Sequence, residues 1–503
     1  MAVDEKGKGP IRGKKKVPSR FALGREDKRN LIILLAIGIA LRLYAFCGFF
    51  MIAIDGAFQY IPVAKLFYDG EYLQALLQPQ LPLYPFLISI VTYITGNFEL
   101  SGQLLSIIFS LLALFPLYLI GRSLFGPKAA FWTTILYLAN PLMLNCSVDV
   151  LKEGLLVFLF LSSVYCSLRF LQEGKGPWLL GTLAFSAAGA LVSMISLAVL
   201  VVLGVWLGYG VLRGRAQERR LVYRYLWVVI AVAGTILIFL MPGLLGWEFW
   251  ITKKPYKVVE GIFYRWFVYE WPSLSQIVKS CLSIISRFIA KTYPVPFVLA
   301  LFGLGWRIKT REFSAEEKYL ALLIGLLIAI LFTHLYASGR YHLLAIFLLY
   351  LWAGFGFVKI KELLDTRFTR YRRLTAAIPV ILILFGALLP ISLHPPRLDK
   401  LGRKEVGVWL REHTLAPPLI LTDDPRVAYY AGGTYLLIPP EARPEEIVEK
   451  GRKEKADYLV IEGKGTQISD AFAPFEKKGA LELILRHPYG HEGRIVYVYK
   501  MKK

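Results

Sequence analysis

A short acidic stretch, Ile54-Asp55-Gly56-Ala57-Phe58-Gln59-Tyr60, follows directly after the first long apolar run of the chain. Its carboxylate, Asp55, is expected where a membrane helix emerges into water. A charged side chain at a membrane face is costly unless it is solvated, paired or used, so Asp55 is a candidate functional residue. From position alone, a solvated residue that ends a helix explains Asp55 equally well.

Further charged groups stand beside other apolar runs. Asp149, Lys152 and Glu153 lie between two such runs, and Arg340 precedes a late one. A carboxylate can deprotonate an attacking hydroxyl, and Arg or Lys can stabilise charge that builds on a departing phosphate. These residue types therefore suit a site that displaces a phosphate from a lipid-linked substrate.

The totals describe a membrane protein with a polar tail. The chain has 503 residues, of which 56% are hydrophobic, and a mean hydropathy of +0.52. Long apolar stretches recur through the first 393 residues, which predicts a polytopic helical membrane protein. The net charge of +23 would suggest nucleic acid in a soluble protein. Here much of it lies in short loops, so membrane orientation explains it and no nucleic-acid partner is expected.

The distribution of Lys and Arg decides which apolar runs cross the membrane. Residues 1–29 are polar and basic, and the run Leu31–Met51 is too long for a cleaved signal, so we expect a cytoplasmic tail and a retained first span. The run Leu81–Thr95 is short and either crosses or lies along the outer surface. If it does not cross, every short inner loop is basic. The expected spans are then about 31–51, 101–121, 128–147, 151–171, 178–194, 196–212, 225–245, 291–306, 319–336, 342–358 and 374–393.

The positive-inside rule therefore favours about eleven transmembrane helices, a cytoplasmic N-terminus and an extracytoplasmic C-terminal domain. The predicted parts are a basic cytoplasmic tail (1–29), a transmembrane domain (30–393) with a catalytic first external loop (52–99), and a soluble domain (394–503).

This topology places Asp55, Asp149 and Arg340 on the same outer side. The loop at about 246–290 is net basic although it is also outside. Such a loop indicates either an anionic ligand, for example a lipid phosphate, or contact with phospholipid headgroups.

The segment from His394 onward has the alternating pattern of a small α/β domain. The predicted helices are 400–413, a short one that ends at Tyr430, and 444–453, and the predicted strands are 418–422, 435–438, 458–462, 481–486 and 494–500. The pair Asp423-Asp424 between a strand and a helix is more typical of a helix cap than of a metal site.

No cofactor or metal is expected. The four cysteines, which lie in or beside apolar runs without a C-x-x-C pair, are typical of core residues: Cys47, Cys146, Cys166 and Cys281. The chain has no Gly-rich phosphate loop, and the expected external loops hold no Asp-x-Asp pair. Arg and Lys can neutralise a lipid phosphate without a metal.

Six short motifs follow one another along the chain. They are Asp55-Gly56-Ala57-Phe58-Gln59-Tyr60, Gln80-Leu81-Pro82-Leu83-Tyr84-Pro85, Gly121-Arg122-Ser123-Leu124-Phe125-Gly126, Asp149 after the next span, Gly339-Arg340-Tyr341-His342-Leu343, and the tail segment 421–430. Their order resembles that of the GT-C glycosyltransferase superfamily, within it the family 39-like group of protein O-mannosyltransferases and lipid A aminoarabinose transferases. The resemblance spans nearly the whole chain.

This resemblance implies a large extracytoplasmic cavity over the first loop, a polyprenyl-phosphate-sugar donor, and Asp55 as the general base. It also implies that Arg340 and Tyr341 lie near the donor phosphate. The candidate substrate-binding residues are Tyr60, Gln80, Tyr84, Asp149, Lys152, Arg265, Arg340, Tyr341 and His342. The aromatic belt of a membrane interface also explains Tyr84 and Tyr341, and a hydrogen-bonded interfacial residue explains His342.

The chain departs from the family pattern at two positions. Many members have Asp-Glu at the catalytic position, whereas Gly56 follows Asp55 here. A Lys of the family's "K-P-P-L-Y-P" segment appears as Gln80. The phosphate contact of that Lys must then come from another cation, and our hypothesis is Lys152, or Arg265 of the basic loop.

We therefore expect an inverting glycosyltransferase of the inner (plasma) membrane that works on its outer face. It would pass a sugar from a polyprenyl-phosphate donor to a lipid, glycan or protein hydroxyl, as in lipid A or protein glycosylation of the cell envelope. One base and a single displacement invert the anomeric carbon, whereas the usual double displacement needs two flanking carboxylates. Membrane lipids are expected partners, and the oligomeric state is left open.

Two other classes of protein are considered. A transporter or flippase for a lipid-linked saccharide favours charges buried within spans and an internal repeat. Only Arg42 is a clear charge within a span, and the two halves do not resemble each other. A structural scaffold that presents the C-terminal domain would leave Asp55 and Arg340 dispensable.

Overall fold

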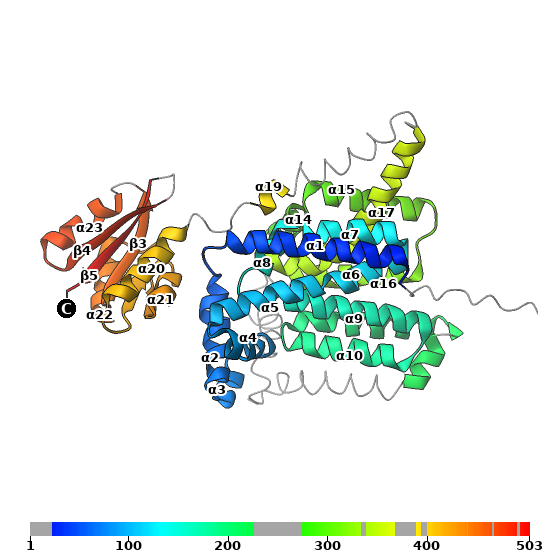
Figure 1. Cartoon of the computed structure of the whole chain (residues 1–503), viewed down its shortest axis with the longest axis horizontal. Coiled ribbons are helices and arrows are strands. Elements are labelled where there is room, and N and C mark those ends of the chain that lie inside the picture. The colour runs from blue at the N-terminus through cyan, green and yellow to red at the C-terminus, as the bar shows by residue number, and fades with distance from the viewer. Residues whose placement is uncertain are drawn as a thin grey trace, which may run out of the picture.

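The computed structural model describes residues 23–216, 218–225, 274–332, 339–367, 389–393, 400–439, 441–464, 467–489 and 493–502. In this part of the chain, long helices form a bundle and the C-terminal residues form a sheet covered by helices (Figure 1).

The bundle is built from helices of unequal length. They are α1 (Arg25–Cys47), α5 (Phe98–Leu112), α6 (Leu114–Phe125), α7 (Pro127–Leu138), α8 (Pro141–Ser147), α9 (Glu153–Glu173), α10 (Gly176–Ala190), η2 (Met194–Leu197), α11 (Ala198–Leu212), α14 (Leu274–Thr292), α15 (Pro294–Lys309), α16 (Ala315–Phe332), η3 (Gly339–His342), α17 (Leu343–Arg367) and α19 (Leu389–Ser392).

Among the described residues, five helical segments are long and apolar enough to cross a membrane, and six if the bent pair of α14 and α15 is one span. This bears out a polytopic helical membrane protein, while the total of eleven stays a prediction. All but the first residue of the expected span 225–245 and most of 374–393 lie outside the described residues.

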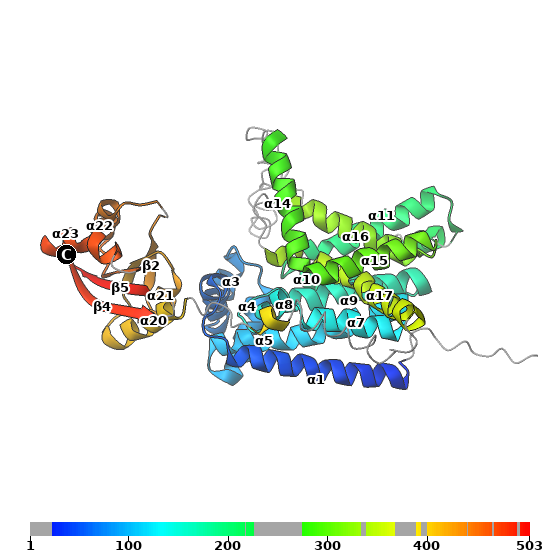
Figure 2. The ribbon, with the colours of Figure 1, turned by 90° about the horizontal axis from the view of Figure 1, so that it is seen from above.

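The first loop folds into four short helices at one end of the bundle. They are η1 (Gly56–Tyr60), α2 (Ile61–Tyr68), α3 (Tyr72–Leu77) and α4 (Leu83–Thr95). Helix α4 has 13 residues, so it is about 20 Å long against the roughly 30 Å of a hydrocarbon core. Figures 1 and 2 place this group at the end of the bundle that faces the C-terminal domain. That position suits a surface helix better than a span.

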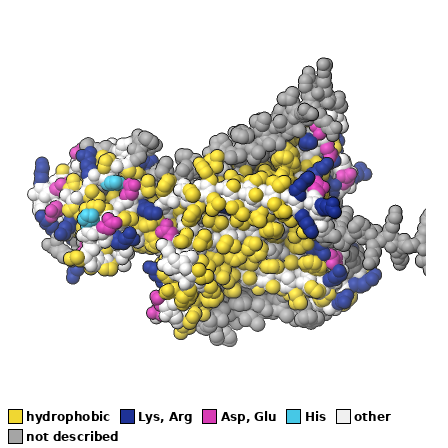
Figure 3. All heavy atoms as spheres, viewed as in Figure 1, with side chains coloured by type: hydrophobic (Ala, Val, Ile, Leu, Met, Phe, Trp, Pro, Cys, Tyr) yellow, Lys and Arg dark blue, Asp and Glu magenta, His cyan; other side chains and the backbone are white. Residues whose placement is uncertain are grey.

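Hydrophobic side chains cover the visible face of the bundle, and Lys and Arg gather at the end away from the C-terminal domain (Figure 3). The basic loops from which the spans were assigned meet at that end: 122–128, 169–175, 213–224, 307–318 and 359–367. The structure therefore places the loops that the charge pattern assigned to one side at one end of the bundle, as the positive-inside rule requires.

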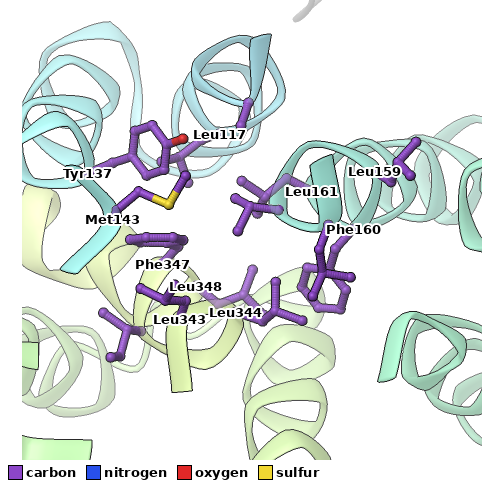
Figure 4. Packing of buried hydrophobic residues seen from close by; sticks show 14 of the residues in the cluster. Leu117, Tyr137, Met143, Leu159, Phe160, Leu161, Leu343, Leu344, Phe347 and Leu348 are labelled. Atoms are coloured by element: carbon purple, nitrogen blue, oxygen red, sulfur yellow. The ribbon is translucent and has the colours of Figure 1, made fainter. Parts of the chain in front are cut away.

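The core of the bundle is packed from aliphatic and aromatic side chains of α7, α9 and α17. Figure 4 shows Phe347 beside Tyr137, and their rings meet edge to face with centroids 4.8 Å apart. The one charge noted within a span, Arg42, is fully buried and donates from Nε to the Ser110 hydroxyl at 2.9 Å. It joins α1 to α5, which is a structural role within the bundle.

The C-terminal domain is a five-stranded sheet in the order β2-β1-β3-β5-β4. Its elements are α20 (Leu401–His413), β1 (Leu419–Thr422), α21 (Arg426–Ala431), β2 (Thr434–Leu437), α22 (Pro444–Lys453), β3 (Tyr458–Lys464), α23 (Gln467–Lys477), β4 (Leu481–Tyr489) and β5 (Arg494–Met501). Strand β1 pairs in parallel with β2 and β3, and β5 is antiparallel to β3 and β4. Each predicted strand and helix is found, and α23 is an element that the sequence pattern missed.

Alternate residues of the central strands enter two separate cores. Ile420 and Val460 pack with α20 and α21, whereas Leu421 and Leu459 pack with α22 and α23. Both faces of the sheet are therefore covered, which explains why the strands read as continuous apolar runs.

The pair Asp423-Asp424 lies just before α21 and forms ion pairs with arginine side chains. Asp424 accepts the Arg426 amide at 3.1 Å and pairs with the guanidinium groups of Arg426 and Arg403. Burial raises the pKa of Asp424, but hydrogen bonds and charge from the two arginines outweigh it and hold that pKa well below its usual range. Asp424 therefore binds the first amide of α21, but Pro425 is the N-cap residue, so the predicted helix cap is not formed by this pair.

The ion pairs of Asp424 make the C-terminal domain sensitive to acid. Because the pKa of Asp424 is lower in the folded chain than in the unfolded one, its stabilisation is complete above about pH 5 and is lost as the pH falls. Asp424→Asn leaves the buried Arg426 guanidinium without its carboxylate partner and is expected to cost about 3 kcal/mol at pH 7. The difference in Tm between wild type and variant, followed by thermal unfolding, should shrink from pH 5 to pH 3. A difference that is constant over this range would contradict the assignment.

Candidate active site

The candidate site centres on an ion pair between two residues that are 285 positions apart. The Arg340 guanidinium donates from Nη2 to Asp55 Oδ2 at 2.5 Å. Both side chains are about a quarter exposed, at 23% and 26%. Asp55 stands immediately before η1, a turn of π-helix, which is a rare element often found at functional sites. The pairing also shows that Asp55 has a partner and is not a merely solvated helix end.

A second carboxylate, Glu153, completes this cluster. Its Oε1 lies 3.3 Å from Arg340 Nη1, and its side chain is only 7% exposed. Glu153 begins α9 directly after Lys152. The sequence showed it beside two candidate residues, but the position alone did not select it as a site residue. Arg340 therefore bridges one accessible and one buried acid.

Asp149 accepts hydrogen bonds from backbone amides near the site. Its carboxylate is 1% exposed, and Oδ1 accepts the amides of Ala53 at 2.9 Å and Val150 at 2.8 Å. It thereby ties the loop before α9 to the segment that leads into Asp55. The geometry is that of a positioning residue.

The segment around Asp55 packs closely against the loop before α9, which explains why residue 56 is a glycine. A Cβ at Gly56 would lie 2.9 Å from both the Cβ and the backbone oxygen of Val150. No side chain fits there without moving the backbone, so the Glu of related sequences has no room. The second acid near Asp55 is supplied instead from α9 by Glu153.

This contact leads to a prediction for Gly56→Ala. The added methyl group should push η1 away from Val150, cost about 1–3 kcal/mol of stability and displace Asp55. We expect at least a tenfold loss of activity, since a misplacement of about 1 Å can cost 100-fold. Gly204→Ala on α11, where nothing lies within 4 Å, is the matched control and should leave Tm and activity unchanged. Wild-type Tm and activity in Gly56→Ala would show that the two segments are not tightly packed.

A small pocket of about 190 Å³ opens next to this cluster. Polar, aromatic and aliphatic side chains line it. They come from the first loop, the start of α9 and the segment that leads into η2: Gln59, Tyr60, Pro79, Gln80, Leu81, Tyr84, Lys152, Val192 and Met194. The structure thus brings four candidate substrate-binding residues from three separate segments into the lining of one pocket: Tyr60, Gln80, Tyr84 and Lys152.

The polar groups of this pocket are held in place. Lys152 donates from Nζ to the Val192 carbonyl at 3.1 Å. The Tyr84 hydroxyl donates to the Gly102 carbonyl at 3.1 Å, and its ring meets Tyr60 edge to face. Burial, with the nearby charges of Glu153 and Asp55, raises the pKa of Tyr60 well above its usual value. Tyr60 therefore remains a neutral hydrogen-bond donor.

The remaining candidate residues are placed as follows. Tyr341 follows Arg340 and is 44% exposed, whereas His342 is fully buried near the ring of Phe288. Arg265 lies outside the described residues, as does most of the basic loop 246–290. Among the described residues, no group of three or more His, Cys, Asp or Glu side chains is arranged to hold a metal ion.

Comparison with known proteins gives a family match over part of the chain. A family model described as "Dolichyl-phosphate-mannose-protein mannosyltransferase" matches residues 78–245. No curated protein matches the sequence.

Solved structures match along almost the whole chain. ArnT from Cupriavidus metallidurans in the apo state has a TM-score of 0.54 and 13% identity over 93% of this chain and 97% of that chain. The archaeal oligosaccharyltransferase AglB from Archaeoglobus fulgidus, in complex with an inhibitory peptide and a dolichol-phosphate, has a TM-score of 0.59 and 13% identity over 94% and 74%. ArnT bound to undecaprenyl phosphate has a TM-score of 0.50 and 12% identity over 93% and 97%.

The chain therefore has the fold of the GT-C membrane glycosyltransferases. This fold was expected from the motifs, and it places the first loop, the start of α9 and η3 around one site.

Proposed function

We propose that this protein transfers a sugar from a polyprenyl-phosphate carrier to a hydroxyl acceptor at the outer face of the membrane. The observation that carries the proposal is the Asp55–Arg340 pair in a GT-C fold, beside a pocket that holds amide, hydroxyl and ammonium groups. The structures of similar fold were solved with undecaprenyl phosphate or a dolichol-phosphate, which supports this class of donor.

The cations bind the phosphate of the donor, and the pocket binds its sugar. Arg340 and Lys152 supply positive charge for the phosphate, and Arg265 remains a third candidate. A volume of about 190 Å³ is below the roughly 300–1,000 Å³ of pockets for drug-sized ligands. This size suits a single sugar ring rather than an oligosaccharide. Gln80, Tyr60 and Gln59 provide the amide and hydroxyl groups that hydrogen-bond sugar hydroxyls.

The chemical step that this geometry supports is a single displacement. Asp55 takes the proton of the acceptor hydroxyl as its oxygen bonds to the anomeric carbon, and the bond from that carbon to the phosphate oxygen breaks. The polyprenyl phosphate leaves with its negative charge stabilised by Arg340 and Lys152. Glu153 is buried against the other guanidinium nitrogen of Arg340, so Asp55 is the accessible carboxylate of the two. One accessible carboxylate gives inversion at the anomeric carbon.

Arg340 also imposes an order on binding. A carboxylate paired with a guanidinium is not free to accept a proton, so Asp55 becomes a base only when Arg340 turns to another anion. The donor phosphate is such an anion, because phosphate accepts two hydrogen bonds from one guanidinium. Donor binding therefore releases Asp55 for the acceptor, and the donor binds first.

Reconstitution of the purified protein in liposomes tests the proposal. With a polyprenyl-phosphate sugar extracted from the source membrane and the matching membrane acceptor, we expect a glycosylated acceptor and free polyprenyl phosphate in equal amounts. Cells without the protein should accumulate the lipid-linked sugar. If the intact lipid-linked sugar instead moves between leaflets and is not consumed, the protein is a flippase.

A further inference from the structure

Tyr430 of the C-terminal domain belongs to the core of the helical bundle. Its side chain is 6% exposed and packs in the same buried cluster as Met51 and Ile52. Its neighbours on α21, Val427 and Ala428, pack inside the C-terminal domain itself. Tyr430 therefore reaches out of its own domain and into the segment that leads to Asp55.

The hydroxyl of Tyr430 satisfies a backbone group of that segment. The Ile52 amide donates to the Tyr430 oxygen at 3.1 Å, and the next amide, that of Ala53, donates to Asp149 at 2.9 Å. Residues 51–53 are not helical and the helix begins at Ile54, so these amides have no carbonyl partner within a helix. Two side chains from distant parts of the chain thus hold consecutive amides immediately before Asp55.

The C-terminal domain also packs against the chain just after Asp55. The ring of Phe58, in η1, meets Tyr435 of β2 edge to face at 4.6 Å and Tyr429 of α21 at 6.4 Å. The Lys404 ammonium stands 4.8 Å above the Tyr430 ring and holds it by a cation–π contact. Asp55 therefore lies between two contacts that only the C-terminal domain supplies.

We infer that Tyr430 is a positioning residue for Asp55, so that the C-terminal domain completes the active site. The inference rests on the proposed function. An anchor that only joins two domains needs no hydrogen bond to the backbone of the catalytic segment. Loss of this bond frees the Ile52 amide and the chain that orients Asp55, and a small displacement of a catalytic group is costly in rate.

Tyr430→Phe tests the inference, because it removes the hydroxyl and keeps the ring contacts. Tyr499→Phe is the matched control: Tyr499 is a fully buried tyrosine of the same domain, and its hydroxyl has no hydrogen-bond partner among the described residues. In the full-length protein, we expect kcat to fall about tenfold in Tyr430→Phe, with donor KM within twofold of wild type. Tyr499→Phe should match wild type in both.

Hydrogen–deuterium exchange of the peptide that spans residues 51–58 provides a readout independent of transfer. Exchange should be faster in Tyr430→Phe and unchanged in Tyr499→Phe, with the same Tm in both. Unchanged exchange in Tyr430→Phe would overturn the inference, and so would faster exchange with wild-type kcat. If the wild-type protein transfers no sugar, the proposed function fails, and the exchange result still decides whether Tyr430 holds the segment of Asp55.

Discussion

Asp55→Asn should abolish sugar transfer while the protein still folds and inserts into the membrane. Asparagine has nearly the same shape and can still accept a hydrogen bond from Arg340, but it cannot take the proton of the acceptor hydroxyl. General bases contribute about 10²–10⁴-fold to a rate. We therefore expect a fall in kcat of about 10³-fold, with the Tm close to that of wild type and a donor KM that is no higher, because Asn competes less than Asp for Arg340.

Asp69→Asn is the matched control for this experiment. Asp69 is an exposed carboxylate of the same loop, at the end of α2 and without a role in the site. The same change of charge there should leave kcat intact. Full activity of Asp55→Asn in the reconstituted assay would remove Asp55 from the mechanism, whatever the control shows.

Arg340→Ala should weaken the use of the donor more than that of the acceptor. Removal of one preorganised group that stabilises developing charge costs about 10²–10³-fold. We expect kcat/KM for the donor to fall by at least 100-fold and inhibition by free polyprenyl phosphate to weaken in parallel, while acceptor KM stays within a few-fold. Arg340→Lys keeps the charge without the planar fork and should recover only part of the activity.

Arg220→Ala is a suitable control, because Arg220 is an exposed cation of the basic loop 213–224 and is not part of the candidate site. It should change neither donor kinetics nor product inhibition. Unchanged donor KM and kcat in Arg340→Ala would show that Arg340 is not at the phosphate and only neutralises Asp55 and Glu153. Donor kinetics and product inhibition thus separate the two roles of this arginine.

Local sequence patterns determined the elements of this protein. The apolar runs predicted the helical membrane domain, because backbone groups in lipid must be satisfied within a helix. The alternating strand and helix patterns of residues 394–503 predicted the strands and most helices of the C-terminal domain. Helix α23 was missed, since Gly463, Gly465 and the internal Pro474 interrupt the helical pattern there.

The sequence also indicated which residue types the site contains. Asp55 stands out because a carboxylate that directly follows an apolar run needs a reason to be there. Charge counting placed it on the same side as Arg340, and the order of the motifs pointed to the GT-C fold that the solved structures share.

Only the tertiary structure decided how these residues meet. The pairing of Asp55 with Arg340 and the bridge to Glu153 join positions that no local pattern relates. In the sequence, Gly56 stands where the family pattern has an acid. In the fold, glycine is the residue type that fits at this position, because a Cβ would collide with Val150. Likewise, nothing near Tyr430 in the sequence shows that its hydroxyl receives the Ile52 amide. Local propensity depends on neighbours along the chain, whereas a site depends on packing between segments that are remote in it.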